Sequence, residues 1–487
     1  MKTGVKTAVG AGTRTGASLP QGGDRRTGRR RARLVAGVLL GLLVGGLAVG
    51  GLLWLQRPQP RPAPPPEPGP AELALAAVHA GVPPEPRDLA VLIEERERRL
   101  REHPRDARSW AVLGMAYVER GRRTADAANY PTAERALRTS LKVWPGNAGA
   151  LEGMTALANA RRDFRAARTW GEAALKADRK RWTTHSLLIE AYTGLGDYKA
   201  ARSTLDRLQK MHSGTAVMVR SAAVYWDRGW REDALATLSD AAATAEAPAE
   251  RAAWLERAGQ LAWERGEREV ALRHFEEALR ADPGQRAAQA GQARALAALG
   301  RTSEALRAYR GAVAERPSPQ YALELGELYE SLGLEQAARA QYDLLHTQVR
   351  SAAAGGVDEE LVLGRYEADH GDPEEAVRLL RAEWRKQPGI AVADALGWAL
   401  HRAGEHEEAL EYAVRATDKE HGGGVRSALY AYHRGMIENT LGLQGPARRH
   451  LREALRINPY FSPLFAPLAR EKLNALGEPP EVPVPAA

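Results

Sequence analysis

Apolar residues recur at helical spacing along most of this chain, in short segments that come in pairs with a glycine between the two members. From about residue 88 to residue 476, a Gly is followed five residues later by an Ala. Successive glycines lie 33, 37, 34, 33, 38, 33 and 38 residues apart, a spacing typical of stacked repeats. The pairs are Gly196/Ala201, Gly229/Ala234, Gly266/Ala271, Gly300/Ala305, Gly333/Ala338, Gly371/Ala376, Gly404/Ala409 and Gly442/Ala447.

Each period predicts two helices joined at the Gly, which ends the first helix because Gly adopts the left-handed conformation without a steric penalty. A small residue that recurs seven residues before this Gly lets the paired helices approach closely, as at Gly114, Gly259, Gly326, Gly364, Gly397 and Gly435. Many units close with a proline, which cannot continue a helix: Pro145, Pro283, Pro317, Pro388 and Pro459. In two units the pattern is imperfect. Arg162 replaces the Gly before Ala167, and about seven extra residues separate Gly121 from Ala133.

These units resemble the tetratricopeptide repeat family. The match to its two-helix signature is carried by Trp110, Leu113, Gly114 and Tyr117 in one first helix and by Ala271, Phe275, Ala278 and Pro283 around one second helix. The resemblance implies an all-α superhelix (a solenoid) of about ten units, whose first helices line a concave groove. A single hairpin cannot bury its apolar face alone, whereas stacked hairpins share a continuous core. Alternating β-branched residues, which would indicate strands, are nearly absent.

Residues 34–55 form an uncharged apolar run of 22 residues, which is long enough to cross a bilayer as one helix. Six Arg lie between Arg25 and Arg33, and only Arg57 and Arg61 follow closely on the other side. This bias predicts a single-pass anchor with a cytoplasmic N-terminus and extracytoplasmic repeats. A cleaved signal peptide remains the alternative, because Ala48-Val49-Gly50 could serve as its cleavage site. With this segment, the chain resembles a membrane-anchored bacterial, actinobacterial-like protein of the repeat family.

The expected organisation has six parts. They are a basic disordered tail (1–33), a transmembrane helix (34–55), a Pro-rich linker (56–72), a linker with a partial helical repeat (73–105), about ten units (106–460), and a C-terminal capping helix with a tail (461–487). Gly37, Gly41 and Gly45 are spaced by four residues, so two such membrane helices could pack as a homodimer; the other interpretation is a Gly-rich apolar filler.

The charge and the motif content exclude several function classes. The net charge of +8 comes from residues 1–33, which hold nine basic residues and one acidic residue, and the remainder is neutral. A basic face for nucleic acid is therefore not expected. The absence of Cys removes disulfides, thiolate metal sites and Cys nucleophiles. Since no nucleotide-binding, metalloprotease, hydrolase or calcium motif occurs, we expect no enzyme activity, no cofactor and no metal.

Two groups of titratable residues receive structural interpretations. His401 and His406 lie five residues apart, a spacing that does not place them on one helix face. Asp369, His370 and Asp372 are expected to form a solvated turn, with Asp372 capping the helix that follows.

The candidate binding residues come from their positions in the repeat. The resemblance implies that the residue six before each loop Gly faces the groove, and this column varies in polarity: Met115, Ala156, Glu190, Ala223, Gln260, Arg294, Glu327, Arg365, Trp398 and Met436. A purely structural column would be uniformly apolar. Positions nine and three before the Gly add Arg and Trp residues, which are the types that anchor interfaces. The resulting set is Arg220, Trp226, Arg257, Trp263, Arg294, Glu327, Arg365 and Trp398.

Trp226 and Trp263 occupy equivalent places in adjacent units, so they could form an aromatic step; the alternative is that they pack between repeats and bind nothing. The Lys and Asn residues with which some family members grip a terminal carboxylate are not found. The leading interpretation is a membrane-anchored scaffold that binds a protein or peptide partner in its groove. The alternatives are an envelope assembly factor that presents a client, as in cytochrome maturation, and a secreted repeat protein whose signal is cleaved.

Overall fold

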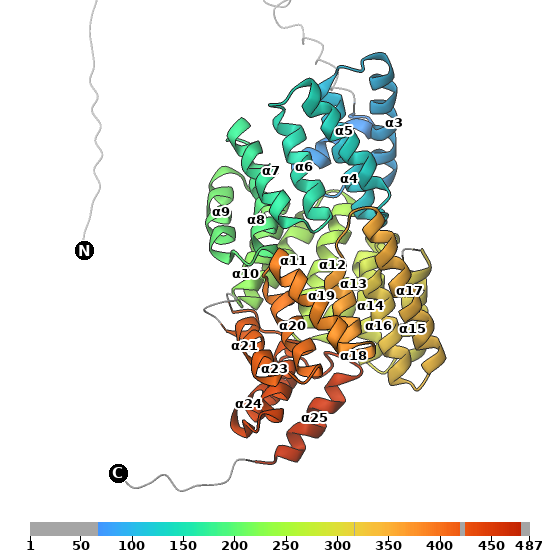
Figure 1. Ribbon diagram of the computed structural model, residues 1–487. Coiled ribbons are helices and arrows are strands. Elements are labelled where there is room, and N and C mark those ends of the chain that lie inside the picture. Colours follow the sequence, from blue (N-terminus) through green and yellow to red (C-terminus); the bar gives the residue numbers. More distant parts are fainter. Residues whose placement is uncertain (1–66, 316, 419–423, 479–487) are drawn as a thin grey trace, which may run out of the picture. The chain divides into compact units, whose positions relative to one another are not determined.

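The computed structural model describes residues 67–315, 317–418 and 424–478, which form helices and turns without a β-strand (Figure 1). The expected all-α solenoid is confirmed for this part of the chain. Its helices are α2 (Pro70–Ala80), α3 (Pro86–Glu102), α4 (Ala107–Thr124), α5 (Asn129–Val143), α6 (Ala148–Ala160), α7 (Phe164–Ala177), α8 (Trp182–Gly194), α9 (Tyr198–Met211), α10 (Thr215–Asp227), α11 (Arg231–Thr244), α12 (Pro248–Glu264), α13 (Arg268–Ala281), α14 (Arg286–Ala298), α15 (Thr302–Glu315), α16 (Pro319–Ser331), α17 (Glu335–Ala354), α18 (Glu360–His370), α19 (Pro373–Lys386), α20 (Ile390–Arg402), α21 (His406–Thr417), α23 (Ala428–Thr440), α24 (Gln444–Ile457) and α25 (Phe465–Leu476).

Within the described ranges, no helix is both long enough and apolar enough to cross a membrane. The basic tail 1–33, the expected membrane helix 34–55 and its glycines Gly37, Gly41 and Gly45 all lie outside the described residues. The anchor and the homodimer therefore stay predictions.

Antiparallel hairpins follow one another from α4–α5 to α23–α24, and each packs against the next. A further pair, α2–α3, precedes them, so the segment expected to hold a linker and half a unit contains two packed helices. After the last hairpin, α25 packs on α24, where Arg448 donates hydrogen bonds to the carbonyls of Leu476 and Gly477 at 2.8 Å each.

The loop glycine takes the left-handed conformation at seven of its eight positions, with φ between +69° and +89°. Gly371 is the exception, with φ −121°. Where the Gly is missing, Arg162 itself adopts φ +60°. In the first unit, α4 continues through Gly121, and Ala125 ends it with φ +51°. The extra residues of that unit thus lengthen the helix by one turn, and the ring of Tyr130 packs directly on the bare backbone of Gly121.

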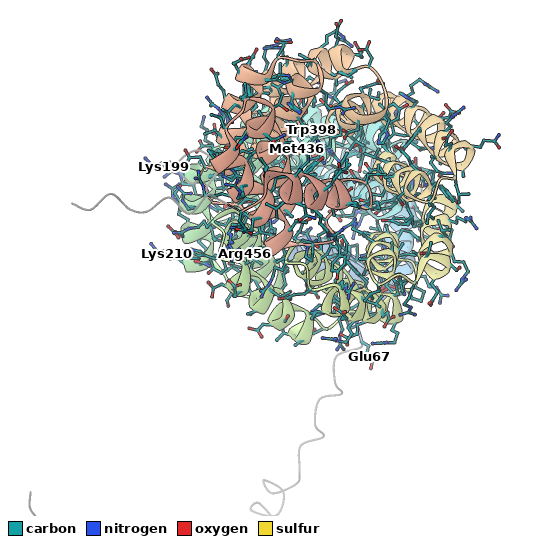
Figure 2. The ribbon with its side chains drawn as sticks, turned by 90° about the horizontal axis from the view of Figure 1, so that it is seen from below. Glu67, Lys199, Lys210, Trp398, Met436 and Arg456 are labelled. Carbon is teal, nitrogen blue, oxygen red and sulfur yellow. The ribbon has the colours of Figure 1, made fainter. Side chains whose placement is uncertain are left out.

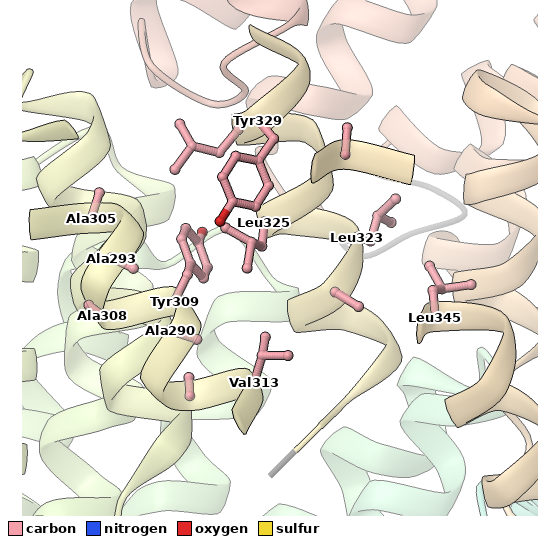
Figure 3. Packing of buried hydrophobic residues seen from close by; sticks show 14 of the residues in the cluster. Ala290, Ala293, Ala305, Ala308, Tyr309, Val313, Leu323, Leu325, Tyr329 and Leu345 are labelled. Atoms are coloured by element: carbon pink, nitrogen blue, oxygen red, sulfur yellow. The ribbon is translucent and has the colours of Figure 1, made fainter. Parts of the chain in front are cut away.

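Small residues at the helix crossings leave room for the large side chains that pack there. A Cβ at Gly259 would lie 2.7 Å from Cε1 of Phe275, whose side chain is fully buried. Figure 3 shows the same principle in α14–α17, where Tyr309, Leu325 and Tyr329 fill the space beside small residues such as Ala293 and Ala305. Burying these apolar surfaces is the main term that holds neighbouring hairpins together.

Successive superhelical turns touch one another. Arg161 Nε donates to Gly355 O at 3.0 Å, and Ile390 N–H donates to the Tyr198 hydroxyl at 3.1 Å. Asn458 Nδ2 donates to Trp263 O at 2.8 Å. These partners are 194, 192 and 195 residues apart. A loop inside one hairpin therefore meets a loop between two hairpins roughly one superhelical turn later.

Three loop glycines have no room for a side chain at this contact. A Cβ at Gly266 would lie 2.8 Å from Ile457 O and 3.0 Å from Asn458 Cα. At Gly196 and Gly229 a Cβ would overlap the carbonyl oxygens of Pro388 and Gly424. The glycines at 300, 333, 404 and 442 have nothing within 4 Å of that position. At this repeat position the Gly forms the loop inside each hairpin. Only at Gly196, Gly229 and Gly266 does it also allow the backbone of another superhelical turn to approach closely.

Candidate functional site

First helices line the interior of the coil, which contains two adjoining cavities. One, cavity A, has a volume of about 900 Å³ and is lined in part by Arg122, Glu190, Tyr198 and Asp227. The other, cavity B, has a volume of about 800 Å³. Both cavities are lined by Trp226, Val425 and Tyr430, so they meet at these residues. In Figure 2, Trp398 lies inside the coil of helices, whereas Lys199 and Lys210 project from its outer side.

Six of the eight candidate residues line cavity B: Trp226, Trp263, Arg294, Glu327, Arg365 and Trp398. The other two lie elsewhere on the first helices. Arg220 pairs with Glu190 at 3.0 Å and donates to Ser186 Oγ at 3.0 Å. The guanidinium of Arg257 lies 5.8 Å from the ring centroid of Trp254. Most of the residues chosen by their position in the repeat therefore line one cavity. Their binding of a partner stays a prediction.

Arg294 is held in a network of hydrogen bonds. Its guanidinium donates to both oxygens of Glu324, at 2.9 and 3.0 Å, and to Gln260 Oε1 at 2.7 Å. The hydroxyl of Tyr309 donates to Glu324 at 3.0 Å. Burial acts to lower the pKa of Arg294, but the carboxylate of Glu324 outweighs it and raises that pKa. Arg294 is therefore a fixed part of the wall rather than a free cation.

Two of the three candidate tryptophans are buried, and Trp226 is half-buried. Trp263 and Trp398 are each 5% exposed. No ring contact joins Trp226 and Trp263 among the described residues, so the aromatic step stays a prediction. Each indole instead has a guanidinium beside it, Arg231 at 5.6 Å from the Trp226 ring and Arg294 at 5.8 Å from the Trp263 ring.

Trp398 belongs to a buried polar cluster in the wall of cavity B. Its ring stacks on His433 with centroids 4.3 Å apart and an angle of 13° between the planes. Nδ1 of His433 lies 3.0 Å from both carboxylate oxygens of Asp394, which is 1% exposed. The indole N–H of Trp398 donates to Asp369 Oδ1 at 2.8 Å. Asp394 thus fixes the orientation of the imidazole.

The expected solvated turn at residues 369–372 is only partly correct. Asp372 caps α19 by accepting from the N–H of Glu374, as expected. His370, however, is largely buried: it stacks on Tyr342 with centroids 4.7 Å apart, and its Nδ1 lies 3.1 Å from Glu330. The turn was misjudged because α16 and α17 of the preceding hairpin cover it.

The rings of His401 and His406 also meet, with centroids 4.9 Å apart, although their spacing argues against one helix face. They lie on two helices, α20 and α21, that fold back on each other. Burial lowers the pKa of His401 to about 4, so this ring is neutral at physiological pH. In the described part of the chain, no group of three or more His, Cys, Asp or Glu side chains could hold a metal ion.

The tetratricopeptide repeat family matches residues 257–318, 291–353 and 361–422. These segments are tetratricopeptide repeats. Such repeats indicate a scaffold for protein–protein interaction. Among curated proteins, none matches the chain.

Several solved structures are similar to this chain at low identity. The human IFIT1 dimer with PPP-AAAA is 16% identical, with a TM-score of 0.45, over 71% of this chain and 80% of its own. YrrB, described as a TPR protein with an unusual peptide-binding site, is 18% identical, with a TM-score of 0.27, over 39% and 96%. A tetratricopeptide repeat protein from Parabacteroides merdae is 18% identical, with a TM-score of 0.31, over 54% and 99%.

The repeats place several interior residues that the candidate set omitted. Glu324 and His433 each lie nine residues before a loop Gly, the same position that supplied Arg220 and Arg257. Reading that column through every tetratricopeptide repeat would have found them. Tyr430 had no such signal, because it borders both cavities only where two superhelical turns meet.

Proposed function

We propose that this protein is a membrane-anchored interaction scaffold that holds a segment of a protein partner inside its superhelix, on the extracytoplasmic side. The observation that carries the proposal is cavity B, around which six candidate residues from six different hairpins converge. Tetratricopeptide repeats support an interaction role, and the charge bias around residues 34–55 supports an anchor in this orientation.

Site-specific photo-crosslinking in cells tests the interior. A photoreactive phenylalanine at position 430 would face both cavities, and one at Met211, which is 41% exposed on α9, is the matched control. We expect an adduct of defined mass from position 430 and none from position 211. Equal adducts at both positions, or none at 430, would contradict the proposal. Protease added to intact cells tests the orientation, because extracytoplasmic repeats would be digested and cytoplasmic ones protected.

A further inference from the structure

Four interior carboxyls form no ion pair with a described Lys or Arg side chain, although Glu327 has a histidine, His370, beside it. Asp227 lines cavity A, and Glu264, Glu327 and Asp369 line cavity B. Glu190 and Glu324 pair with Arg220 and Arg294, but none of these four pairs with a Lys or Arg among the described residues. The groups that contact these four carboxyls carry no permanent charge. Gln260 donates to Glu264 at 3.0 Å, Trp398 donates to Asp369, Thr193 hydrogen-bonds Asp227, and His370 Nε2 lies 3.8 Å from Glu327.

Three of these carboxyls recur at one repeat position, two residues before the loop glycine, at or next to the last residue of a first helix. Asp227 ends α10 and Glu264 ends α12, while Asp369 is the last residue but one of α18. The C-terminal end of a helix carries partial negative charge, so an acid there is unfavourable by about 0.3 to 1 kcal/mol. An acidic residue that recurs where it destabilises the helix indicates a functional role, here the binding of a ligand inside the coil.

A second observation also indicates a ligand. His433 lines cavity B, its side chain is 6% exposed, and Nε2 has no hydrogen-bond partner. With Nδ1–H donating to Asp394, Nε2 is the ring nitrogen left to contact a guest in cavity B, and it accepts an N–H when it carries no proton. Indole and phenol rings also line the two cavities, and such faces attract organic cations.

We propose that the interior binds a Lys- or Arg-rich segment of a partner, whose ammonium or guanidinium groups pair with Asp227, Glu264, Glu327 and Asp369. This inference rests on the proposed function and adds the charge of the partner. Among the described guanidiniums that line the cavities, Arg294, Arg162 and Arg470 are engaged with Glu324, Glu359 and the carbonyl of Pro459, and Arg122 lies 4.0 Å from Glu119. Arg365 is the exception.

The protonation of the four groups agrees with a role in binding a cation. Burial raises the pKa of Asp227 to about 7, and it also raises the pKa of Glu264, Glu327 and Asp369. The charges facing them are Arg294, Arg231 and Arg365 near Glu264; His370, Asp369 and Glu324 near Glu327; and His433, His370 and Arg402 near Asp369. A bound cation would stabilise the ionised carboxylates, so binding should release protons and strengthen as the pH rises toward 8.

Fluorescence anisotropy of the full chain tests this inference. The probe is a short labelled peptide of alternating Lys and Ala, compared with peptides in which Gln or Glu replaces every Lys and with an oligoadenylate RNA. We expect the Lys peptide to bind about tenfold or more tightly than the other three, and its affinity to rise between about pH 5.5 and pH 8. Glu264→Gln and Asp369→Asn should each weaken binding about three- to tenfold, because an amide keeps the hydrogen bond but loses the charge. Glu335→Gln, on an exposed carboxylate paired with Arg339, is the control and should leave binding unchanged.

The outcomes separate the inference from the proposed function. Equal or tighter binding of the Glu peptide, the Gln peptide or the RNA overturns the inference, as does an affinity that falls with rising pH. If the crosslink at position 430 captures a partner through an acidic or neutral sequence, the inference fails while the interior scaffold stands. A crosslink to the protein's own residues 25–33 would replace the separate partner by the chain's own basic tail and would also overturn it. Loss of far-UV helicity in a variant is checked first, and the Glu264→Gln and Asp369→Asn variants are tested independently.

Discussion

Gly266 and Gly300 offer a matched test of the contact between superhelical turns. They occupy the same repeat position in adjacent hairpins and have similar left-handed conformations, with φ +80° and +75°. A Cβ at Gly300 would meet nothing within 4 Å, whereas one at Gly266 would meet the backbone of Ile457 and Asn458 at 2.8 and 3.0 Å. Substituting each with Ala therefore changes the turn equally and the contact between turns at only one site.

The magnitudes follow from these distances. An L-residue in the left-handed region costs about 1 to 2 kcal/mol, partly offset by the lower chain entropy of unfolded Ala, so Gly300→Ala should lose about 1 kcal/mol. At Gly266 the opposing backbone must also move by roughly 0.6 Å to restore ordinary contact, and overpacking of this kind costs about 1 to 3 kcal/mol more. We expect Gly266→Ala to lose about 2 to 4 kcal/mol in total, concentrated at the contact.

Hydrogen exchange read by mass spectrometry is the appropriate assay, because long repeat arrays do not unfold in a single two-state step. Gly266→Ala should speed exchange in residues 455–462 on the opposing loop, and Gly300→Ala should leave that segment unchanged. The urea midpoint by circular dichroism gives the accompanying loss of stability. If the two variants lose equal stability and exchange equally in residues 455–462, the superhelical turns do not stabilise one another at this contact and the reasoning is refuted.

Three further results are expected. Asn458→Ala should remove the buried hydrogen bond to Trp263 and cost about 1 to 3 kcal/mol, seen as faster exchange at both loops, whereas an unchanged rate would contradict the contact. Arg294→Met should destabilise the hairpins around it by about 2 to 4 kcal/mol, seen as faster hydrogen exchange in α14 and α16, since Glu324 would be left largely buried without its partner; an unchanged exchange rate would show that the network adds nothing. Burial raises the pKa of Glu383, which is fully buried, to about 7, so the folded protein retains a proton that the unfolded chain has released. Stability should therefore fall as the pH rises from about 4.5 to about 7, and Glu383→Gln should flatten that slope; a slope that persists would assign it to other groups.

The hairpins could be predicted because their signals are local. A Gly that ends a helix and an Ala five residues later act within one unit, and they hold at seven of eight loops. The turn-to-turn contact could not be predicted in this way. Gly266 and Gly300 occupy the same repeat position, yet only Gly266 meets another backbone. That difference depends on small rotations that accumulate over successive hairpins, which no single repeat encodes.

The candidate site likewise contains residues that the repeat pattern predicts and contacts that it does not. Position within the repeat identified interior residues such as Arg365 and Glu327, because all first helices turn one face inward. It could not show that Arg294 is already committed to Glu324, since that pair joins two hairpins through side-chain reach. It did not show that His433, which shares the column of Arg220 and Arg257, is held by a hydrogen bond to Asp394 from another hairpin.

Contact between turns restricts how the number of repeats can vary. In a solenoid whose hairpins touch only their neighbours, one hairpin can be gained or lost with local consequences. Here the loops at Arg161, Tyr198 and Trp263 are bonded to loops 192 to 195 residues later. One hairpin inserted between residues 270 and 350 would shift all three later loops away from their partners, so the three hydrogen bonds would be lost together. The array can therefore lengthen at its two ends, whereas its middle tolerates changes only within loops that face away from the neighbouring turn.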